Sequence, residues 1–203
     1  MNWALRKINY NILVPNIGKH IYELSEAEAA DYFAWYVDVV PQRVAYLAEI
    51  CAKEYGVSEE KLDCSPESLL IIWKWFRRRA KTESTKLPKE TKQSSCLTHR
   101  RASQTRQLTL ETEYVLRDIG MYLGETIRKN CPNIYWSYYT TPKRDFFVNY
   151  PLLKGFIDRS FGSPQEVCFE PIHMARMQAL KIIDRTSKDD DLFNLYNLWS
   201  QKV

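Results

Sequence analysis

One segment of this chain is apolar on nearly all sides, so other parts of the chain must cover it. The segment follows Ser65-Pro66 and ends at three consecutive arginines. Its large apolar residues are Leu69, Leu70, Ile71, Ile72, Trp73, Trp75 and Phe76. A helix without a polar stripe is stable in water only when its neighbours bury it, which predicts a central helix in a packed domain. The uninterrupted apolar run, Leu69 to Trp73, is far shorter than the roughly 20 residues that cross a membrane, so we predict no membrane span.

The rest of the chain supplies enough apolar material to build such a domain. Of its 203 residues, 45% are hydrophobic and 27% are charged, a balance that is typical of globular proteins and excludes wholesale disorder. This length predicts one domain over residues 1–203. No continuous apolar stretch with a small-residue cleavage site follows Arg6 and Lys7, so we expect no secretory signal and a cytoplasmic location.

The first half of the sequence predicts an N-terminal helical bundle. Ser25 and Glu28 fit a capping box at the start of a helix that runs to about Val40. Pro41 disfavours helical geometry in the residue before it, so we expect a break there and a second helix that ends near Gly56. The two helices would form a helical hairpin, to which the apolar helix after Ser65-Pro66 adds a third member.

The second half predicts a long helix followed by an aromatic β-hairpin. Thr109 can cap a helix from Leu110 to about Asn130, in which Gly120 and Gly124 lie one turn apart. Glycine in a helix interior costs up to about 1 kcal/mol relative to alanine, so we expect close approach of another backbone there.

After that helix, aromatic and β-branched residues predict two antiparallel strands, Ile134–Thr140 and Phe146–Tyr150, joined by a polar turn. Another strand can lie within Leu5–Val14. Helices over 171–184 and after the Asp189–Asp191 run complete the chain. The predicted fold class is α+β: a mainly helical single domain with an N-terminal helical bundle and a C-terminal long helix plus aromatic hairpin.

Positive charge is concentrated in one stretch. Between Arg77 and Arg106 there are ten basic and two acidic residues, whereas the remainder of the chain has 19 basic and 23 acidic residues. From Thr82 to Gln107 the stretch is rich in Ser, Thr and Lys and lacks aromatic residues, so it cannot bury enough apolar area to fold by itself. We interpret residues 82–107 as a basic flexible insertion. It is either a solvated linker or an electrostatic arm for nucleic acid or an acidic partner. The candidate contacts of the arm are Arg77, Arg78, Arg79, Arg100 and Arg101.

Few motifs for catalysis are present. The five cysteines form no Cys-x-x-Cys pair and the three histidines are far apart, so we predict no metal site and no cofactor. The chain lacks a phosphate-binding loop and a Gly-x-Ser-x-Gly elbow. We therefore favour a protein that is not an enzyme.

Glu125 is the residue for which a catalytic role deserves a test. It follows Gly124 on the close-packing side of the long helix, where a carboxylate needs a partner such as the Trp136 N–H, a tyrosine hydroxyl or an arginine. A structural hydrogen bond is the favoured interpretation, and a hydrolase of unrecognised type centred on Glu125 is the alternative. That alternative requires a concave pocket around Glu125 that contains a second titratable group.

The aromatic hairpin supplies the candidate contacts of a protein-interaction module. Lys143 and Arg144 lie in its turn, and Trp136 and Tyr138 share one face of its first strand. Because Tyr, Trp and Arg dominate energetic hot spots, we expect a protein partner to bind there by surface complementarity.

Two short stretches carry a resemblance to a group of uncharacterised bacterial proteins. Residues 32–36 (Tyr-Phe-Ala-Trp-Tyr), followed by residues 41–43 (Pro-Gln-Arg) and Leu47, are similar to the helical signature of that group. Residues 120–125 (Gly-Met-Tyr-Leu-Gly-Glu), with Trp136 after them, resemble its second motif. Some such proteins act as immunity partners of bacterial toxins. The resemblance implies an immunity- or inhibitor-type protein with a toxin as partner, although the basic insertion departs from the compact pattern of the group.

Overall fold

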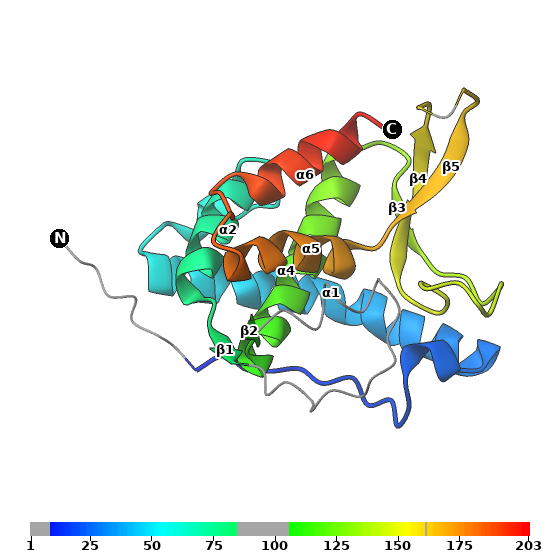
Figure 1. Cartoon of the computed structure of the whole chain (residues 1–203), viewed down its shortest axis with the longest axis horizontal. Coiled ribbons are helices and arrows are strands. Elements are labelled where there is room, and N and C mark those ends of the chain that lie inside the picture. Colours follow the sequence, from blue (N-terminus) through cyan, green and yellow to red (C-terminus); the bar gives the residue numbers. More distant parts are fainter. Residues whose placement is uncertain (1–8, 85–105, 161) are drawn as a thin grey trace, which may run out of the picture.

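The computed structural model describes residues 9–84, 106–160 and 162–203. Helix α4 passes through the middle of the molecule, other helices surround it, and a three-stranded sheet lies at one end (Figure 1). This arrangement confirms the predicted mixed, mainly helical α+β domain. The elements are η1 (Ile21–Glu23), α1 (Glu26–Tyr55), η2 (Glu59–Lys61), α2 (Ser68–Arg79), β1 (Thr82–Ser84), β2 (Arg106–Leu108), α4 (Leu110–Asn130), β3 (Tyr135–Ser137), β4 (Leu152–Asp158), β5 (Gln165–Phe169), α5 (Pro171–Ile183) and α6 (Asp191–Ser200).

Helix α1 is continuous, so the predicted helical hairpin is wrong. Its ends are as expected: Ser25 and Glu28 form the capping box, and Gly56 ends the helix in the left-handed conformation. Pro41, however, lies inside the helix. Pro41 and Val37, whose carbonyl loses its helical hydrogen bond, are both exposed, so water can satisfy that carbonyl. Buried residues on both sides of Pro41 pack into the same core, which favours one long helix over two.

Helix α2 is buried as predicted. Leu69, Ile72, Trp73, Trp75 and Phe76 are each fully inaccessible to solvent. Both indole N–H groups have acceptors: Trp73 donates to the Lys188 carbonyl at 3.0 Å and Trp75 donates to Glu54 at 2.8 Å. The tryptophans can therefore be buried without leaving a polar group unpaired.

The predicted close approach occurs where α4 crosses α5. A Cβ atom on Gly120 would lie 2.5 Å from the Ile172 Cα, and one on Gly124 would lie 2.5 Å from the Trp136 ring. At Gly120 the helices α4 and α5 therefore meet at a spacing that only glycine permits, whereas at Gly124 the close neighbour is the Trp136 side chain and not another backbone.

We expect Gly120→Ala to lower the free energy of unfolding by about 1–3 kcal/mol, because the clash is with backbone and requires a helix to move. Urea unfolding measures this loss. Gly18→Ala is the matched control, because a Cβ at Gly18 would meet nothing within 4 Å. Equal stability of the two variants would show that the helices can move apart without cost.

The sheet differs from the predicted hairpin. Strand β3 pairs antiparallel with β4, which pairs antiparallel with β5, and residues 146–150 form no strand. In this register Trp136 lies opposite Leu153 and Phe156 lies opposite Val167. The prediction paired two neighbouring aromatic segments, whereas the partner of β3 is the buried apolar strand that follows them. Residues 138–150 instead form a long loop, called the 138–150 loop below.

Arginines on α1 and α4 hold the N-terminal segment against these helices. Residues 9–14 form no strand, contrary to the expectation for Leu5–Val14. The Tyr46 hydroxyl accepts from the Asn11 backbone N–H at 2.7 Å. Arg43 donates to the Asn11 carbonyl at 2.8 Å, and Arg117 donates to the carbonyl of Leu13. These bonds use main-chain groups that would otherwise pair in a sheet; residues 5–8 lie outside the described part.

The predicted insertion begins and ends in a short β-ribbon. Strands β1 and β2 pair antiparallel, with Thr82 opposite Leu108 and Ser84 opposite Arg106. Residues 85–105 lie outside the described part of the chain. The ends of residues 82–107 therefore belong to the fold, next to the start of α4.

Candidate functional site

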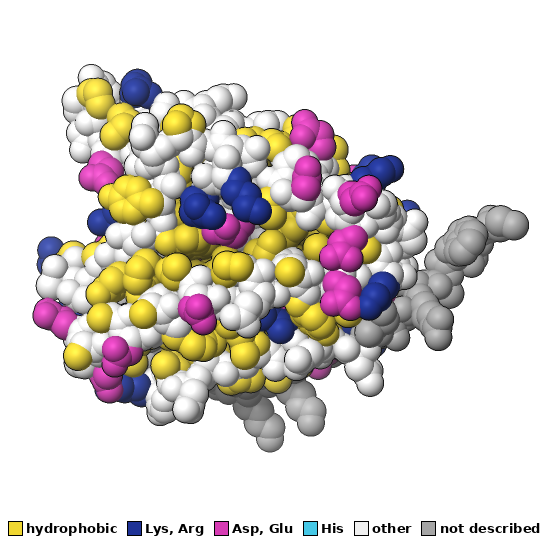
Figure 2. Space-filling view, turned by 180° about the vertical axis from the view of Figure 1, so that it is seen from behind, with side chains coloured by type: hydrophobic (Ala, Val, Ile, Leu, Met, Phe, Trp, Pro, Cys, Tyr) yellow, Lys and Arg dark blue, Asp and Glu magenta, His cyan; other side chains and the backbone are white. Residues whose placement is uncertain are grey.

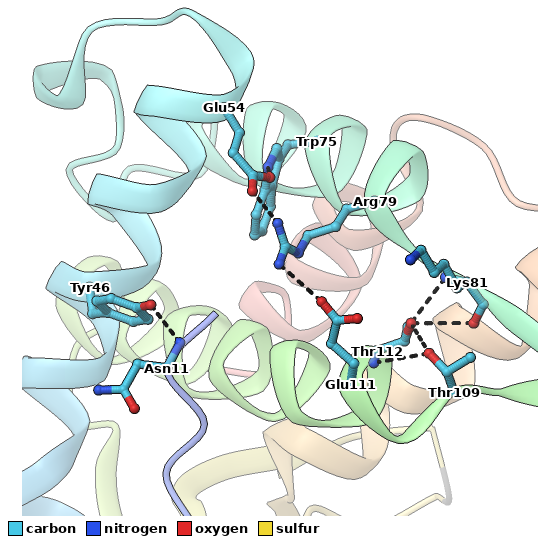
Figure 3. A network of polar contacts seen from close by, with 9 residues as sticks. All are labelled: Asn11, Tyr46, Glu54, Trp75, Arg79, Lys81, Thr109, Glu111 and Thr112. Carbon is cyan, nitrogen blue, oxygen red and sulfur yellow. Dashed lines mark hydrogen bonds and ion pairs between the residues drawn. The ribbon is translucent and has the colours of Figure 1, made fainter. Parts of the chain in front are cut away.

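The three arginines at the end of α2 are engaged within the fold. Arg79, whose side chain is 4% exposed, forms an ion pair with buried Glu54 and reaches Glu111 at 3.3 Å (Figure 3). Arg77 pairs with Asp189, and the Arg78 guanidinium lies 4.9 Å from the centre of the Tyr55 ring. Arg79 is too buried to contact nucleic acid.

Arg100 and Arg101 lie outside the described residues. Of the five predicted nucleic-acid contacts, the structure thus places three, and it places all three in intramolecular contacts.

Glu125 has the kind of partner that the sequence predicts. The Trp136 indole donates to it at 2.7 Å, and the Arg128 guanidinium donates to both of its oxygens at 2.8 Å. Burial alone would raise the pKa of Glu125, but the hydrogen bonds from Arg128 and Trp136 outweigh it and hold the pKa below its usual value.

A lowered pKa does not suit a general acid. Glu125 also lines none of the cavities at residues 15–35, 76–115 and 178–198. These observations favour the structural role of Glu125 over the hydrolase. Trp136, which the sequence assigns to a contact face, is instead directed toward Glu125 and α4.

Cys168 lacks the lowered pKa that an activated thiol nucleophile requires. Its thiol is exposed on β5, and desolvation raises its pKa. Among the described residues, no group of three or more His, Cys, Asp or Glu side chains is arranged to hold a metal ion.

The 138–150 loop is fixed against the start of α1. The buried Asn149 side chain donates to the carbonyls of Ile21 and Leu24 at 3.0 Å each. Lys143 approaches the same Leu24 carbonyl at 3.4 Å. Tyr138 leaves the sheet after β3 and stacks on Phe33 of α1, with ring centres 4.7 Å apart. The hairpin residues of the prediction and the first turns of α1 therefore occupy the same end of the molecule.

This loop presents an exposed aromatic side chain directly after three charged residues. Phe146 is 72% exposed, and its ring lies 4.9 Å from that of Phe147 and 5.6 Å from that of His173. Arg144 is also exposed. Asp145 accepts from the Tyr139 hydroxyl at 2.6 Å and from the Phe147 N–H at 2.9 Å, so the loop beneath Phe146 is internally bonded. Phe146 thus projects from a supported backbone.

A cavity of about 360 Å³ lies beside this loop, and we call it the α1 pocket. No motif in the sequence predicts it, because it forms only when residues 15–24 fold back onto the first turns of α1. The spacing of acidic and aromatic residues in the first three turns of α1 is the signal that could have indicated it. The lining residues are Pro15, Asn16, Ile17, Gly18, Lys19, Leu24, Glu28, Asp31, Tyr32 and Trp35.

Of the three charged residues that line the α1 pocket, two form an ion pair with each other. Lys19 lies 2.7 Å from Glu28. The hydrogen bond from Lys19, together with those from Ser25, lowers the pKa of Glu28 to about 2. The exposed Asp31 carboxylate makes no hydrogen bond or ion pair with a described residue.

Hydrophobic side chains gather on the face of the molecule that Figure 2 shows. Seen from behind in Figure 2, they extend across the middle of the molecule toward the end at which α1 begins in Figure 1. Charged side chains interrupt them.

Comparisons with protein-family models, with curated proteins and with solved structures found no match. Within the described residues, no helix has the length and apolar character needed to cross a membrane.

Proposed function

We propose that this protein is a protein-interaction module whose contact surface consists of the 138–150 loop and the adjoining α1 pocket. The observation that carries the proposal is the exposure of Phe146 on a hydrogen-bonded loop, next to Lys143 and Arg144. A preorganised aromatic side chain beside an arginine has the composition of a binding hot spot. Little entropy is lost when such a loop binds, because its backbone is already ordered.

An immunity- or inhibitor-type role is the specific form of this proposal. The resemblance described above implies it, and the partner would then be a bacterial toxin. Inhibition by surface complementarity needs a rigid contact surface and no catalytic group, which suits a loop supported in this way.

We expect a photo-crosslinking amino acid at position 146 to capture a discrete protein from nuclease-treated lysate of the source organism. The same amino acid at exposed Leu198 of α6 is the control. With the captured protein purified, Phe146→Ala should weaken binding at least about tenfold, since truncation of a hot-spot side chain costs about 2 kcal/mol or more and about 1.4 kcal/mol corresponds to a tenfold change in affinity. Leu198→Ala should leave the affinity unchanged. Capture from both positions alike, or equal affinities, would contradict the proposal.

Nucleic-acid binding through the basic segment gives a different result in the same assay. Replacing residues 85–105 with Asn-Gly keeps the paired strands β1 and β2, because this dipeptide forms a two-residue hairpin turn. Steeply salt-dependent retention of nucleic acid by the intact chain alone would replace the proposal with this alternative. Retention of the same protein partner by both forms would support the proposed protein-interaction module.

A further inference from the structure

The α1 pocket has an aromatic wall that comes from one face of a helix. Trp35 follows Asp31 by four residues and Tyr32 by three, so these side chains lie on one side of α1. The rings of Tyr32 and Trp35 are stacked at 5.6 Å. The opposite wall is formed by residues 15–19 and Leu24. The cavity therefore offers flat π-surfaces, an aliphatic wall and a carboxylate at one site.

The charge of the lining is negative once its internal ion pair is considered. Lys19 and Glu28 neutralise each other at 2.7 Å, and no described residue forms an ion pair with Asp31. Lys143 approaches the Leu24 carbonyl but does not line the cavity. The chain outside Arg77–Arg106 also carries 23 acidic against 19 basic residues. The pocket thus favours a cationic ligand over an anionic or a neutral one.

A guanidinium group matches this combination better than an ammonium group does. It is planar and weakly hydrated, so it can stack on an aromatic ring while it donates to a carboxylate. Its aliphatic stem can pack against Ile17 and Leu24. An ammonium group is strongly hydrated and presents no flat face, so it gains less from the rings.

We propose that the α1 pocket binds an arginine side chain from a basic segment of a partner protein. This rests on the proposed function, because it specifies the chemistry of the partner that the surface would bind. The guanidinium would lie against Trp35 and donate to Asp31, while Phe146 contacts the partner outside the pocket.

The test is a titration followed by ¹⁹F NMR of the full chain labelled with 5-fluorotryptophan. Trp35→Phe assigns the Trp35 resonance among those of the six tryptophans. The probes are N-acetyl-Gly-Arg-Gly-amide, its citrulline isostere, which has the same shape without the charge, and its lysine counterpart. We expect saturable shifts of the Trp35 resonance with the arginine peptide, with binding at least about fivefold weaker for the citrulline and lysine peptides.

Substitutions locate the binding site. Asp31→Asn should weaken binding of the arginine peptide at least about fivefold, because it removes the lining charge that pairs with no residue of the described ranges. Asp38→Asn is the matched control, since Asp38 is exposed on the same helix and does not line the pocket. Both carboxylates are exposed, so neither change should alter the folded structure, and an unchanged melting temperature checks this.

Several outcomes would overturn the proposal. Equal shifts with the arginine and citrulline peptides would show an apolar pocket, and equal shifts with lysine would show a non-selective charge effect. Absence of any shift would show that the cavity binds no guanidinium. A partner captured through position 146 whose affinity is unaffected by Asp31→Asn would refute the arginine pocket while leaving the proposed function intact.

Discussion

Replacing Asp118 with alanine is expected to lower the free energy of unfolding by about 3–5 kcal/mol, because it leaves a buried arginine without a counter-charge. Asp118 on α4 is fully inaccessible to solvent. One of its oxygens accepts from the Arg43 Nε at 3.1 Å and from the Tyr10 hydroxyl at 2.6 Å. Arg43 itself is 8% exposed, so water cannot replace the lost carboxylate.

Urea unfolding at neutral pH measures this loss, provided that the slope against urea concentration stays constant. Glu113→Ala on the same helix is the control. Glu113 pairs with Arg176, which is 50% exposed, and exposed pairs contribute at most about 1 kcal/mol. Equal losses of unfolding free energy for the two variants would show that burial does not increase the contribution of the Arg43–Asp118 pair to stability.

The network around Asp118 also binds the N-terminal segment to the helices. The Arg43 and Arg79 guanidinium groups lie 5.6 and 5.5 Å from the centre of the Tyr10 ring. The Asp118→Ala variant is therefore expected to release residues 9–14 as well. Faster proteolysis of that segment, measured before global unfolding, would show its release.

Glu170→Gln is expected to remove a pH dependence of stability of about 3 kcal/mol. Glu170 is 5% exposed and precedes α5, where it accepts from the backbone N–H groups of Ile172 and His173. Burial raises its pKa from 4.5 to about 7, against the opposing effect of these two hydrogen bonds.

The sign follows from the raised pKa. Between pH 4.5 and 7 the folded state keeps a proton on Glu170 that the unfolded state has released. The contribution of this group to stability is therefore fully present below pH 4.5 and is lost as the pH rises through 7. The shift from 4.5 to about 7 corresponds to about 3 kcal/mol.

The measurement is urea unfolding of the wild type and of Glu170→Gln from pH 4.5 to pH 8. Glutamine keeps an oxygen that can cap α5, so the variant is expected to gain stability relative to the wild type as the pH rises. Glu166→Gln, which changes an exposed carboxylate on β5, controls for a general charge effect. Parallel pH profiles of the wild type and Glu170→Gln would contradict the prediction.

Some features of the site could be predicted from the sequence, while others could not. A carboxylate beside Gly124 needed a hydrogen-bond donor, and Trp136 and Arg128 supply it. The turn cations Lys143 and Arg144 are exposed as expected. The α1 pocket and the burial of Glu170 were not predicted. The pocket depends on how residues 15–24 fold back onto the first turns of α1, and the burial of Glu170 depends on the packing of the surrounding elements.

The sequence by itself determined the elements whose signals are local. Ser25 and Thr109 cap their helices, and Gly56 ends α1. Helix α2 is apolar on nearly all sides and therefore requires burial. These features can be predicted because caps and helical periodicity act between residues within a few turns. The tertiary structure decided the continuity of α1 through Pro41 and the pairing of β3 with β4. These depend on which distant residues share a core. The free energy of that packing exceeds the local preference of a proline, and it overrides the tendency of neighbouring aromatic segments to pair.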